Sequence, residues 1–444
     1  MLEFANGGDL IKIIENGGEC AYYVGGCVRD YMLGKSGGDV DIATSASPHK
    51  VVELMRKNSV AVYETGIQHG TVTAVHKGAH YEITTFRTDG EYNDFRRPES
   101  VNFVKSIEED LSRRDFTVNA MACSLSGEII DLYGGKIDIE NKIIRTVGDA
   151  DKRFSEDALR IMRALRFASV LGFEIESNTE KALFRNKELL LNVSAERIYN
   201  ELSKLLCGDN VLSVLDKYRD IIGVVIPELV PCFECVQNTP WHIYNVYEHI
   251  INAVAYSKPN PDLRLTMLLH DIGKPAVKKT DENGRDHFKT HAQAGAEIAE
   301  KVLKRFKVST KTLKHITTLV KYHQSVQNVG KINIKRWFNL ISPENTFDLL
   351  DVRIADLKAH NPEKVQHEIV ILENMKTQAR EILERGEPYR ICDLAVNGND
   401  LIALGFSGRQ VGEKLGQILD KVIDGVLQNE KDEIMDYIKT ADGE

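Results

Sequence analysis

A strand, a pair of glycines, a short helix and a second strand follow one another between residues 21 and 44, and this order restricts how the chain can fold. The apolar residues 21–24 end at Gly25 and Gly26, where the backbone can turn with positive φ and approach a ligand closely. Arg29 then lies at the mouth of the expected helix, a position suited to binding an anion. In the second expected strand, 39–43, Asp39 and Asp41 lie on one face, where Mg²⁺ bound together with substrate phosphates would relieve their repulsion. The pattern predicts a nucleotidyl-transfer site.

Either half of this pattern, taken alone, favours a simpler interpretation. A Gly-Gly pair usually forms only a turn, and alternating aspartates on an exposed strand are often solvated. The order of the two halves and the short distance between them favour a binding site instead.

Composition indicates an ordinary water-soluble protein. The 444 residues suffice for roughly two to four domains. No apolar run reaches the length of a membrane span, and the N-terminus lacks the pattern of a signal peptide, so we expect no membrane partner. The seven scattered cysteines predict free thiols and a cytoplasmic location, and the single CxxC, at Cys232 and Cys235, is interpreted as two core thiols.

The formal net charge of −9 argues against extensive non-specific binding to nucleic acid. Local basic surfaces remain compatible with this negative net charge. The candidates are Arg96-Arg97, Arg113-Arg114 and the run Lys301, Lys304, Arg305, Lys307, Lys311 and Lys314, which equally fits a solvated helix face.

Residues 20–130 predict a sheet of about five strands covered by helices. Two amphipathic helices are expected to cover the sheet, one within residues 1–18 and one that begins at Ser47-Pro48. Further strands are expected at 60–63, 70–75 and 80–86. Glu82, on the last of these strands, is a candidate third carboxylate beside Asp39 and Asp41.

Two further segments carry paired charges. Residues 88–104 read as a long functional loop, and the following segment, 107–123, predicts a helix that brings Arg114, Asp115 and Asn119 together. These side chains suit a triphosphate and ribose hydroxyls, although a surface ion pair is the simpler alternative.

From about residue 150 the pattern becomes wholly helical. A helix over 154–167 would place Asp157, Arg160 and Arg163 on one face, where an acceptor and donors can read a base edge or merely form weak surface pairs. Another helix is expected at 195–206.

Six segments together resemble the tRNA nucleotidyltransferase/poly(A) polymerase family, and within it the bacterial class II CCA-adding enzymes. They are GGCVRD (25–30), DVDIAT (39–44), RRDFTVNA (113–120), DLYGG (131–135), EDALRIMRALRF (156–167) and ERIYNELSKLL (196–206). The resemblance implies an α+β architecture, in which a small polymerase-β-like mixed-sheet head is followed by an all-helical neck, body and tail. The expected boundaries are 1–146 for the head, 147–225 for the neck, 226–365 for the body and 366–444 for the tail.

The resemblance also implies an activity and roles for particular residues. The activity is template-independent addition of C, C and A to the 3′ end of tRNA from CTP and ATP, by two-metal transfer. Asp39 and Asp41 would bind Mg²⁺, with Glu82 as a third catalytic carboxylate. The expected nucleotide-binding residues are Gly25, Gly26 and Arg29 at the triphosphate, Arg114, Asp115 and Asn119 at the nucleotide and ribose, Asp157 and Arg160 at the base edge, and Arg163 and Arg166 in support.

The second half carries histidines and aspartates at spacings typical of separate helices in a bundle, which favours a metal site. This half resembles the HD phosphohydrolase domain. The implied ligands are His249, His270, Asp271 and Asp356, with His291 and His323 for a second ion, and His242 is expected outside them. A divalent transition metal or Mg²⁺ there would hydrolyse phosphoesters at RNA 3′ ends, unless the domain serves mainly to bind tRNA.

Other functions remain open from the sequence. Within the same family the chain could add only A, either to tRNA ending in CC or as a poly(A) polymerase. From another class, it could be chiefly an HD phosphohydrolase with a degenerate head, although the intact Asp39, Asp41 and Arg114 count against this. A non-catalytic RNA-binding module is disfavoured because the carboxylates would then be incidental. The oligomeric state is not predicted.

Overall fold

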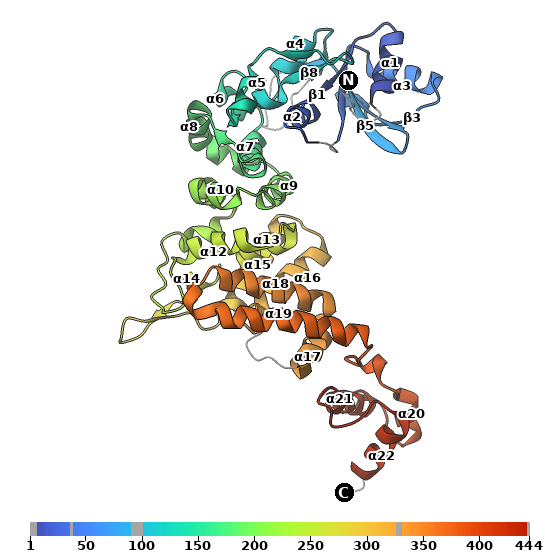
Figure 1. The fold of residues 1–444 in the computed structure, drawn as a ribbon, viewed down its shortest axis with the longest axis vertical. Coiled ribbons are helices and arrows are strands. Elements are labelled where there is room, and N and C mark those ends of the chain that lie inside the picture. The colour runs from blue at the N-terminus through green and yellow to red at the C-terminus, as the bar shows by residue number, and fades with distance from the viewer. Residues whose placement is uncertain (1–6, 36–38, 90–100, 326–330, 442–444) are drawn as a thin grey trace. The chain divides into compact units, whose positions relative to one another are not determined.

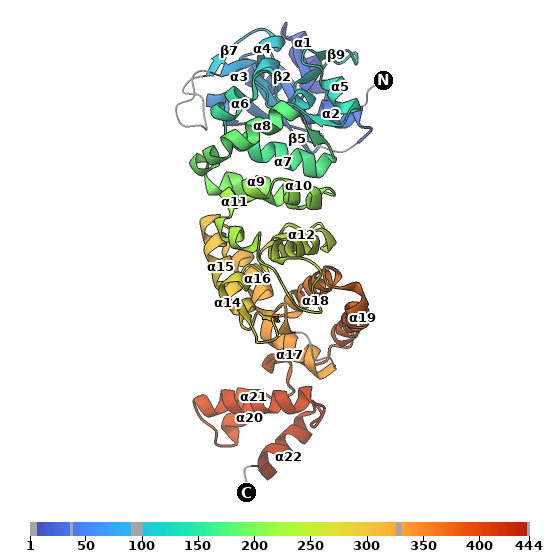
Figure 2. The same ribbon diagram turned by 90° about the vertical axis from the view of Figure 1, so that its left-hand side faces the viewer.

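The structure is a computed structural model that describes residues 7–35, 39–89, 101–325 and 331–441. The chain divides into two compact units, residues 1–227 (unit 1) and 228–444 (unit 2), each with its own core. Figures 1 and 2 show the elements of each unit, mixed α and β in the first and almost entirely helical in the second.

Unit 1 is built on a mixed seven-stranded sheet with the order β3-β4-β5-β2-β1-β8-β9. The strands are β1 (Ala21–Val24), β2 (Asp41–Thr44), β3 (Ala61–Gly66), β4 (Thr71–His76), β5 (Ala79–Thr85), β8 (Met121–Cys123) and β9 (Ile129–Asp131). Strands β2 and β5 pair in parallel, which places Asp41 directly beside Glu82 in the register, and β1 lies antiparallel to β2. The predicted strands are confirmed within a few residues, and the sheet gains β8 and β9.

The segment 107–123 was predicted as one helix, and this is wrong beyond its first half. Only α4 (Ile107–Ser112) is helical; a 3₁₀ turn, η2 (Thr117–Asn119), and strand β8 follow it. The Asp115 carboxylate accepts a hydrogen bond from its neighbour's backbone N–H, that of Phe116 (2.8 Å), and Thr117 N–H donates to the Arg145 carbonyl (2.9 Å). These bonds replace helical ones, since short polar side chains offer the backbone an alternative partner.

Helices of unit 1 cover the sheet and continue beyond it. They are α1 (Gly8–Asn16), α2 (Gly26–Met32), α3 (Pro48–Lys57), α5 (Gly135–Glu140), α6 (Ala150–Glu156), α7 (Leu159–Leu171), α8 (Ser177–Asn186), α9 (Ala195–Leu206), α10 (Val211–Lys217) and α11 (Arg219–Val225). The helix expected over 154–167 is interrupted between α6 and α7, because Asp157 has an extended backbone (φ −140°, ψ 102°). Its carboxylate accepts the Leu159 N–H (3.1 Å) and so begins α7.

Three predicted bounds fall within or beside elements of the structure. Residues 88–104, predicted as a loop, begin and end in a paired ribbon of β6 (Arg87–Asp89) and β7 (Val101–Phe103), while 90–100 lie outside the described residues. The strand expected to begin at residue 39 begins at Asp41, so Asp39 precedes it. The boundary placed after residue 365 falls inside α19 (Pro362–Glu384).

Unit 2 consists of helices that surround a buried polar centre. Its longer helices are α12 (Val246–Tyr256), α13 (Pro261–Leu269), α15 (His291–Arg305), α16 (Thr310–Tyr322), α17 (Lys331–Ile341), α18 (Pro343–Lys358) and α19. Buried apolar side chains line α12, α13 and α18, yet four histidines with 0–2% exposure lie among them. Burying so many imidazoles requires that each has a hydrogen-bonding or metal partner.

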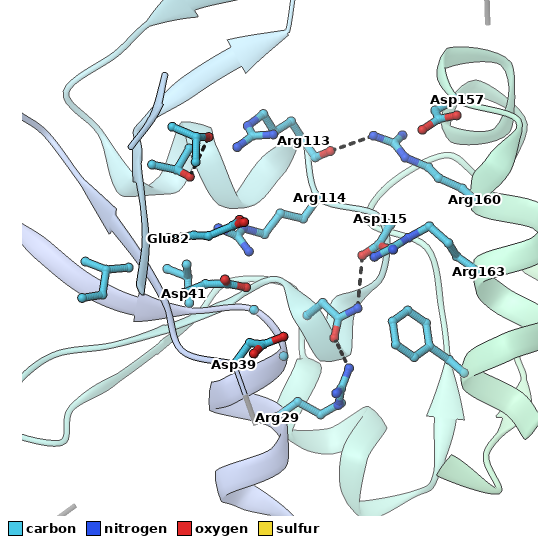
Figure 3. A pocket seen from close by; sticks show the side chains of 18 of the residues that line it. Arg29, Asp39, Asp41, Glu82, Arg113, Arg114, Asp115, Asp157, Arg160 and Arg163 are labelled. Carbon is cyan, nitrogen blue, oxygen red and sulfur yellow. Dashed lines mark hydrogen bonds and ion pairs between the residues drawn. The ribbon is translucent and has the colours of Figure 1, made fainter. Parts of the chain in front are cut away.

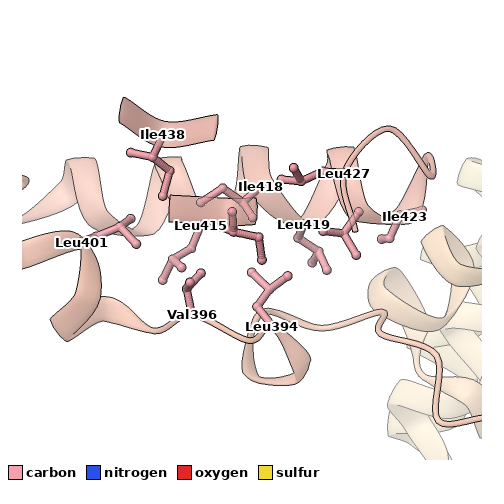
Figure 4. Close-up of a cluster of buried hydrophobic side chains, with 11 residues drawn as sticks. Leu394, Val396, Leu401, Leu415, Ile418, Leu419, Ile423, Leu427 and Ile438 are labelled. Carbon is pink, nitrogen blue, oxygen red and sulfur yellow. The ribbon is translucent and has the colours of Figure 1, made fainter. Parts of the chain in front are cut away.

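The last part of unit 2 has a separate apolar cluster, shown in Figure 4. It joins α20 (Gly398–Ala403), α21 (Arg409–Ile423) and α22 (Lys431–Ala441) to the segment around Leu394 and Val396. Leu401, Ile418 and Ile434 are fully buried within it. These residues therefore fold around a core of their own.

The structure also describes the state of the cysteines and the hydropathy of the helices. All seven cysteines belong to the described part of the chain and are free thiols. Among the helices of the described residues, none is both long and apolar enough to cross a membrane.

Candidate functional site

A polar pocket of about 620 Å³ lies in unit 1 against the ends of β1, β2 and β5. Figure 3 shows the carboxylates of Asp39, Asp41 and Glu82 on one side of it and a group of arginines on the other. Asp41 and Glu82 are brought together by the parallel register of β2 and β5, and Asp39 joins them from the residues just before β2. Three acidic groups on one wall form the kind of oxygen-ligand set that holds Mg²⁺.

The electrostatics of Asp41 reflect this crowding. Burial raises the pKa of Asp41 to about 6, the negative charge of Glu82 and then of Asp39 adds to the rise, and Arg114 opposes it. An acid whose charged form is destabilised by burial and by like charges binds a cation favourably, because the cation removes the repulsion. The three residues therefore fit a divalent metal.

Arg114 lies near Asp41, and Gly25 lies beside both side chains. Gly25 has φ +75°, and a Cβ atom there would lie 3.0 Å from Arg114 Nη1 and 3.8 Å from Asp41 Oδ2. Arg114 is held from behind by the buried Asp110, which accepts its Nη2–H (3.0 Å), while its buried Nε has no hydrogen-bond partner among the described residues. The side chain is thus fixed at one end and retains a donor for a ligand.

Arg29 belongs to a second set of cations, deeper in the same pocket. It extends from α2, is 8% exposed, and donates from Nη1 to Asn119 Oδ1 (2.6 Å). Asn119 in turn donates to Asp115 (3.3 Å), so the structure connects Asp115 and Asn119, two of the three residues expected to lie together, with Arg29. Arg114, the third residue of the expected group, lies in the same pocket but makes neither of these two contacts.

Buried Asp115 forms an ion pair with the half-buried Arg163 of α7. Arg163 Nε and Nη2 both reach Asp115 Oδ2, at 2.7 and 2.6 Å. Burial would raise the pKa of Asp115, but Arg163 and then Arg160 lower it to about 2. The Phe167 ring lies 5.2–5.4 Å from the guanidinium carbons of Arg29 and Arg163, which fixes these cations further.

Asp157 and Arg160 line the same pocket and are both already anchored. Asp157 Oδ2 accepts from Arg197 of α9 (2.8 Å). Arg160 donates from Nη1 to Glu156 (2.8 Å) and from Nη2 to the Arg113 carbonyl (3.0 Å). A carboxylate has about four acceptor positions and a guanidinium five N–H groups, so both retain capacity for a base edge. Arg166, on the next turn of α7, pairs with Glu201 (3.0 Å).

Three residues that position the site were missed by the sequence reasoning. Asp110 holds both Arg113 and Arg114, Phe167 stacks against the arginines, and Arg113 supplies the carbonyl that fixes Arg160. The signal for Asp110 was present, since acidic and basic residues three and four apart form pairs on a helix. Phe167 gave none, because an aromatic residue on a helix usually belongs to a core.

Unit 2 brings together the six predicted metal-ligating residues in its buried centre. His249 Nε2 lies 3.0 Å from Asp356 Oδ1 and 3.3 Å from both Asp271 Oδ2 and His270 Nε2. On the other side of Asp271, His291 Nε2 lies 3.2 Å from its Oδ1 and 3.2 Å from His323 Nε2. Asp271 therefore belongs to two adjacent groups, His249–His270–Asp271 and Asp271–His291–His323, that could each hold a metal ion.

The backbone orients all four of these imidazoles the same way. Each Nδ1 faces a backbone carbonyl, at 2.7–3.2 Å, which favours the tautomer with a lone pair on Nε2. The carbonyls belong to Ala359, Met267, Phe288 and Val320. Neutral Nε2 atoms only 3.2–3.3 Å apart repel one another unless a proton or a metal ion lies between them. Burial would lower the pKa of His270, but Asp271 and Asp356 raise it to about 10, so the field at this point favours a cation.

The structure adds three residues around this centre. His242, expected outside the ligands, forms a further possible metal group with His249 and His360. Its ring centroid is 5.0 Å from that of His249 and 4.3 Å from that of His360. Lys274 Nζ, almost fully buried, lies 2.6 Å from Asp271 Oδ2 and neutralises part of the acidic charge.

Comparison with known protein families matches three segments of the chain. A profile described as "Poly A polymerase head domain" matches residues 21–145, and one described as "Probable RNA and SrmB- binding site of polymerase A" matches 172–229. In the second half, "tRNA nucleotidyltransferase domain 2 putative" matches residues 287–438.

Curated relatives and solved structures give a consistent result. A CCA-adding enzyme of Bacillus pumilus is 36% identical over 98% of this chain and 96% of its own length. One of Geobacillus stearothermophilus is 55% identical over 45% of this chain and 48% of its own length. The crystal structure of the Bacillus stearothermophilus CCA-adding enzyme in complex with CTP superposes with a TM-score of 0.78 at 31% identity, covering 100% of this chain and 98% of that one.

Proposed function

The chain belongs to the family of CCA-adding nucleotidyltransferases, and on this basis we propose that it adds C, C and A in turn to the 3′ end of tRNA, using CTP and ATP. The observation that carries the proposal is the single pocket in which three carboxylates face a wall of fixed arginines. A related solved structure at 31% identity holds CTP, which supports a nucleotide as the ligand of this pocket.

Each side of the pocket has a separate task in this proposal. Asp39 and Asp41, with Glu82 beside them, would hold Mg²⁺, which supplies charge neutralisation and acidifies the attacking 3′-hydroxyl. Arg114 and Arg29 bind triphosphate oxygens, because guanidinium groups already held by Asp110 and Asn119 need little reorganisation.

Base selection falls to Asp157 and Arg160. One presents acceptors and the other donors, and both are fixed at the beginning of α7 by Arg197 and by Glu156. A site that reads hydrogen-bonding edges rejects bases whose edges leave its polar groups unpaired. The remaining family alternatives, an A-adding enzyme and a poly(A) polymerase, use the same surface and are separated by the experiment below.

The test is incorporation of labelled CTP and ATP, separately and together, into tRNA transcripts that end at the discriminator base, at C and at CC. We expect CTP and then ATP to be added, stopping after one A, and the Asp41→Ala variant to be inactive. Incorporation of ATP alone on the CC transcript would indicate an A-adding enzyme, and a long A tail on any RNA a poly(A) polymerase. Absence of incorporation would refute the proposal.

We propose a second activity for unit 2, hydrolysis of phosphoesters at RNA 3′ ends by a metal centre of the HD type. The support is the convergence of four Nε2 atoms on Asp271 and Asp356, each imidazole being oriented by a backbone carbonyl. His249, His270, Asp271 and Asp356 would hold one ion, and His291 and His323 with Asp271 a second. A bound divalent metal supplies a nucleophilic hydroxide at neutral pH.

The two activities can be tested on one substrate. A tRNA transcript that ends in a 2′,3′-cyclic phosphate has no free 3′-hydroxyl and cannot be extended until the ring is opened and the phosphate removed. We expect Asp271→Ala to lose CTP incorporation on this transcript and to keep it on the matched transcript with a free hydroxyl. Equal incorporation by wild type and variant on both transcripts would refute the second activity and leave the first intact.

A further inference from the structure

The metal centre of unit 2 borders a second pocket, of about 660 Å³, to which none of the observations above assigns a ligand. This volume lies within the roughly 300–1,000 Å³ typical of pockets for small ligands. His242, His291 and His360 form part of its lining, and the apolar side chains of Leu357, Val365 and Ile371 form another part. The pocket thus combines the histidines of the metal centre with an apolar surface.

The charges around this pocket favour a phosphate. Its two acidic lining residues are already paired, Asp286 with Lys278 (2.9 Å) and Glu368 with Arg353 (2.8 Å). Arg285 and Lys289 also line it, are exposed, and have no ion-pair partner in the part of the chain that the structure describes. Although the net charge of the chain is −9, this pocket therefore carries two cations, Arg285 and Lys289, that have no ion-pair partner among the described residues.

Trp241 gives the pocket an aromatic surface. Its side chain is 47% exposed although it lines a pocket, and its backbone carbonyl is fixed by Asn361 N–H (2.9 Å) at the junction of α18 and α19. The adjacent His242 contributes a buried Nδ1 without a hydrogen-bond partner among the described residues. A large aromatic ring and an unpaired polar atom beside a cationic pocket suit a ligand that has both a planar ring and polar edges.

We propose that this pocket binds the terminal nucleotide of an RNA strand, with its phosphate toward the histidine cluster and its base stacked on Trp241. The inference rests on the proposed phosphoesterase activity and names its substrate: a nucleoside 3′-phosphate or 2′,3′-cyclic phosphate rather than a base-free phosphoester. Stacking tolerates any base, because every base has a π-face, so ends of different sequence are accepted.

Binding can be measured through the intrinsic fluorescence of the protein. The chain has two tryptophans, Trp241 and Trp337, both in unit 2, and Trp337 packs edge-on against Tyr322 with ring centroids 5.5 Å apart. The W337F variant therefore reports on Trp241 alone, and W241F is its matched control. We expect adenosine 3′-phosphorothioate, a slowly hydrolysed probe, to quench W337F and not W241F, and inorganic phosphate to quench neither. Absence of quenching of W337F would overturn the proposal.

Hydrolysis separates this inference from the activity on which it rests. The substrates are adenosine 2′,3′-cyclic phosphate and the cyclic phosphate of methyl riboside, which lacks a base, each followed by ³¹P NMR. We expect W241A to raise KM for the adenosine substrate about tenfold, since base–aromatic stacking contributes on this order, W241F to restore it, and the base-free substrate to be unaffected.

The outcomes have distinct meanings. If wild type hydrolyses both substrates equally well and W241A changes neither, the base site is refuted and the phosphoesterase stands. If W337F is quenched by the phosphorothioate but the metal-loaded protein hydrolyses neither substrate, the binding site stands and the phosphoesterase is refuted.

Discussion

Replacing Asp41 with Asn should stabilise the metal-free protein while abolishing its transferase activity. Burial and the neighbouring Glu82 raise the pKa of Asp41 from 3.8 to about 6, a difference of about two units. At 1.36 kcal/mol per unit, ionising Asp41 in the folded state costs at most about 3 kcal/mol. Because the side chain opens onto a solvent-filled pocket, screening reduces this to about 1–2 kcal/mol.

The pH dependence follows from the direction of the shift. A carboxyl group whose pKa is raised in the folded state carries no penalty below about pH 4, where it is protonated in both states, and the full penalty above about pH 6. The advantage of Asp41→Asn should therefore be present at pH 7.5 and disappear toward pH 4.5. For a unit of about 200 residues, 1–2 kcal/mol corresponds to a rise in Tm of about 2–8 °C.

The assay is thermal unfolding in EDTA at both pH values, with Asp39→Asn as the matched control, since Asp39 is exposed. Adding Mg²⁺ should raise the Tm of wild type more than that of Asp41→Asn, because the amide is a poorer ligand than the carboxylate. The reasoning is refuted if Asp41→Asn is no more stable than wild type at pH 7.5, or if its advantage is the same at pH 4.5.

Three further predictions concern the other contacts. Gly25→Ala should lower CTP incorporation without preventing folding, because the residue has φ +75° and the new Cβ would lie 3.0 Å from Arg114 Nη1; steady-state kinetics and circular dichroism check this. Asp115→Asn should lower the free energy of unfolding by about 1–3 kcal/mol, since it leaves Arg163 without its main partner, and this loss, measured in urea, should shrink as the pH falls from 4 toward 2, where wild type becomes half protonated. His323→Ala should reduce the bound metal, measured by atomic emission, more than the equally conservative exposed variant His367→Ala.

The carboxylate wall was predicted from a strand period of two, although only Asp41 and Glu82 lie on strands. Asp39 and Asp41 were placed on one face from their spacing alone, and Glu82 was added as the residue on a neighbouring strand. The structure brings all three into one pocket through the β2–β5 pairing. The spacing did not predict where β2 begins, because the strand starts at Asp41 and Asp39 lies outside it.

The helices around the polar pocket of unit 1 were harder to predict, for one physical reason. Asp115 and Asp157 lie inside segments with a helical pattern, yet each accepts a hydrogen bond from a backbone N–H one or two residues further on. Such local bonds interrupt a helix that apolar periodicity favours. Both residues line the pocket of unit 1, while the helical backbone predicted for them is wrong.

The candidate metal centre of unit 2 shows the reverse relation between sequence and structure. The six residues predicted to ligate a metal were identifiable by residue type and spacing, and all six meet in the structure. The groups that orient the imidazoles are backbone carbonyls, such as those of Met267 and Val320, and these have no signature in a sequence. His360 was missed because a single histidine at a helix end has no pattern.

Net charge was a poor guide to ligands in this chain because its cations are neutralised locally. Asp110 lies three and four residues before Arg113 and Arg114 and pairs with both. The same short spacing joins Asp271 to Lys274 in the metal centre. These aspartates cancel charge in the sum, yet they hold the cations in fixed positions, which lowers the entropy lost when a phosphate binds. Acidic residues three or four positions from a pocket cation therefore indicate a preorganised phosphate site more directly than a positive net charge does.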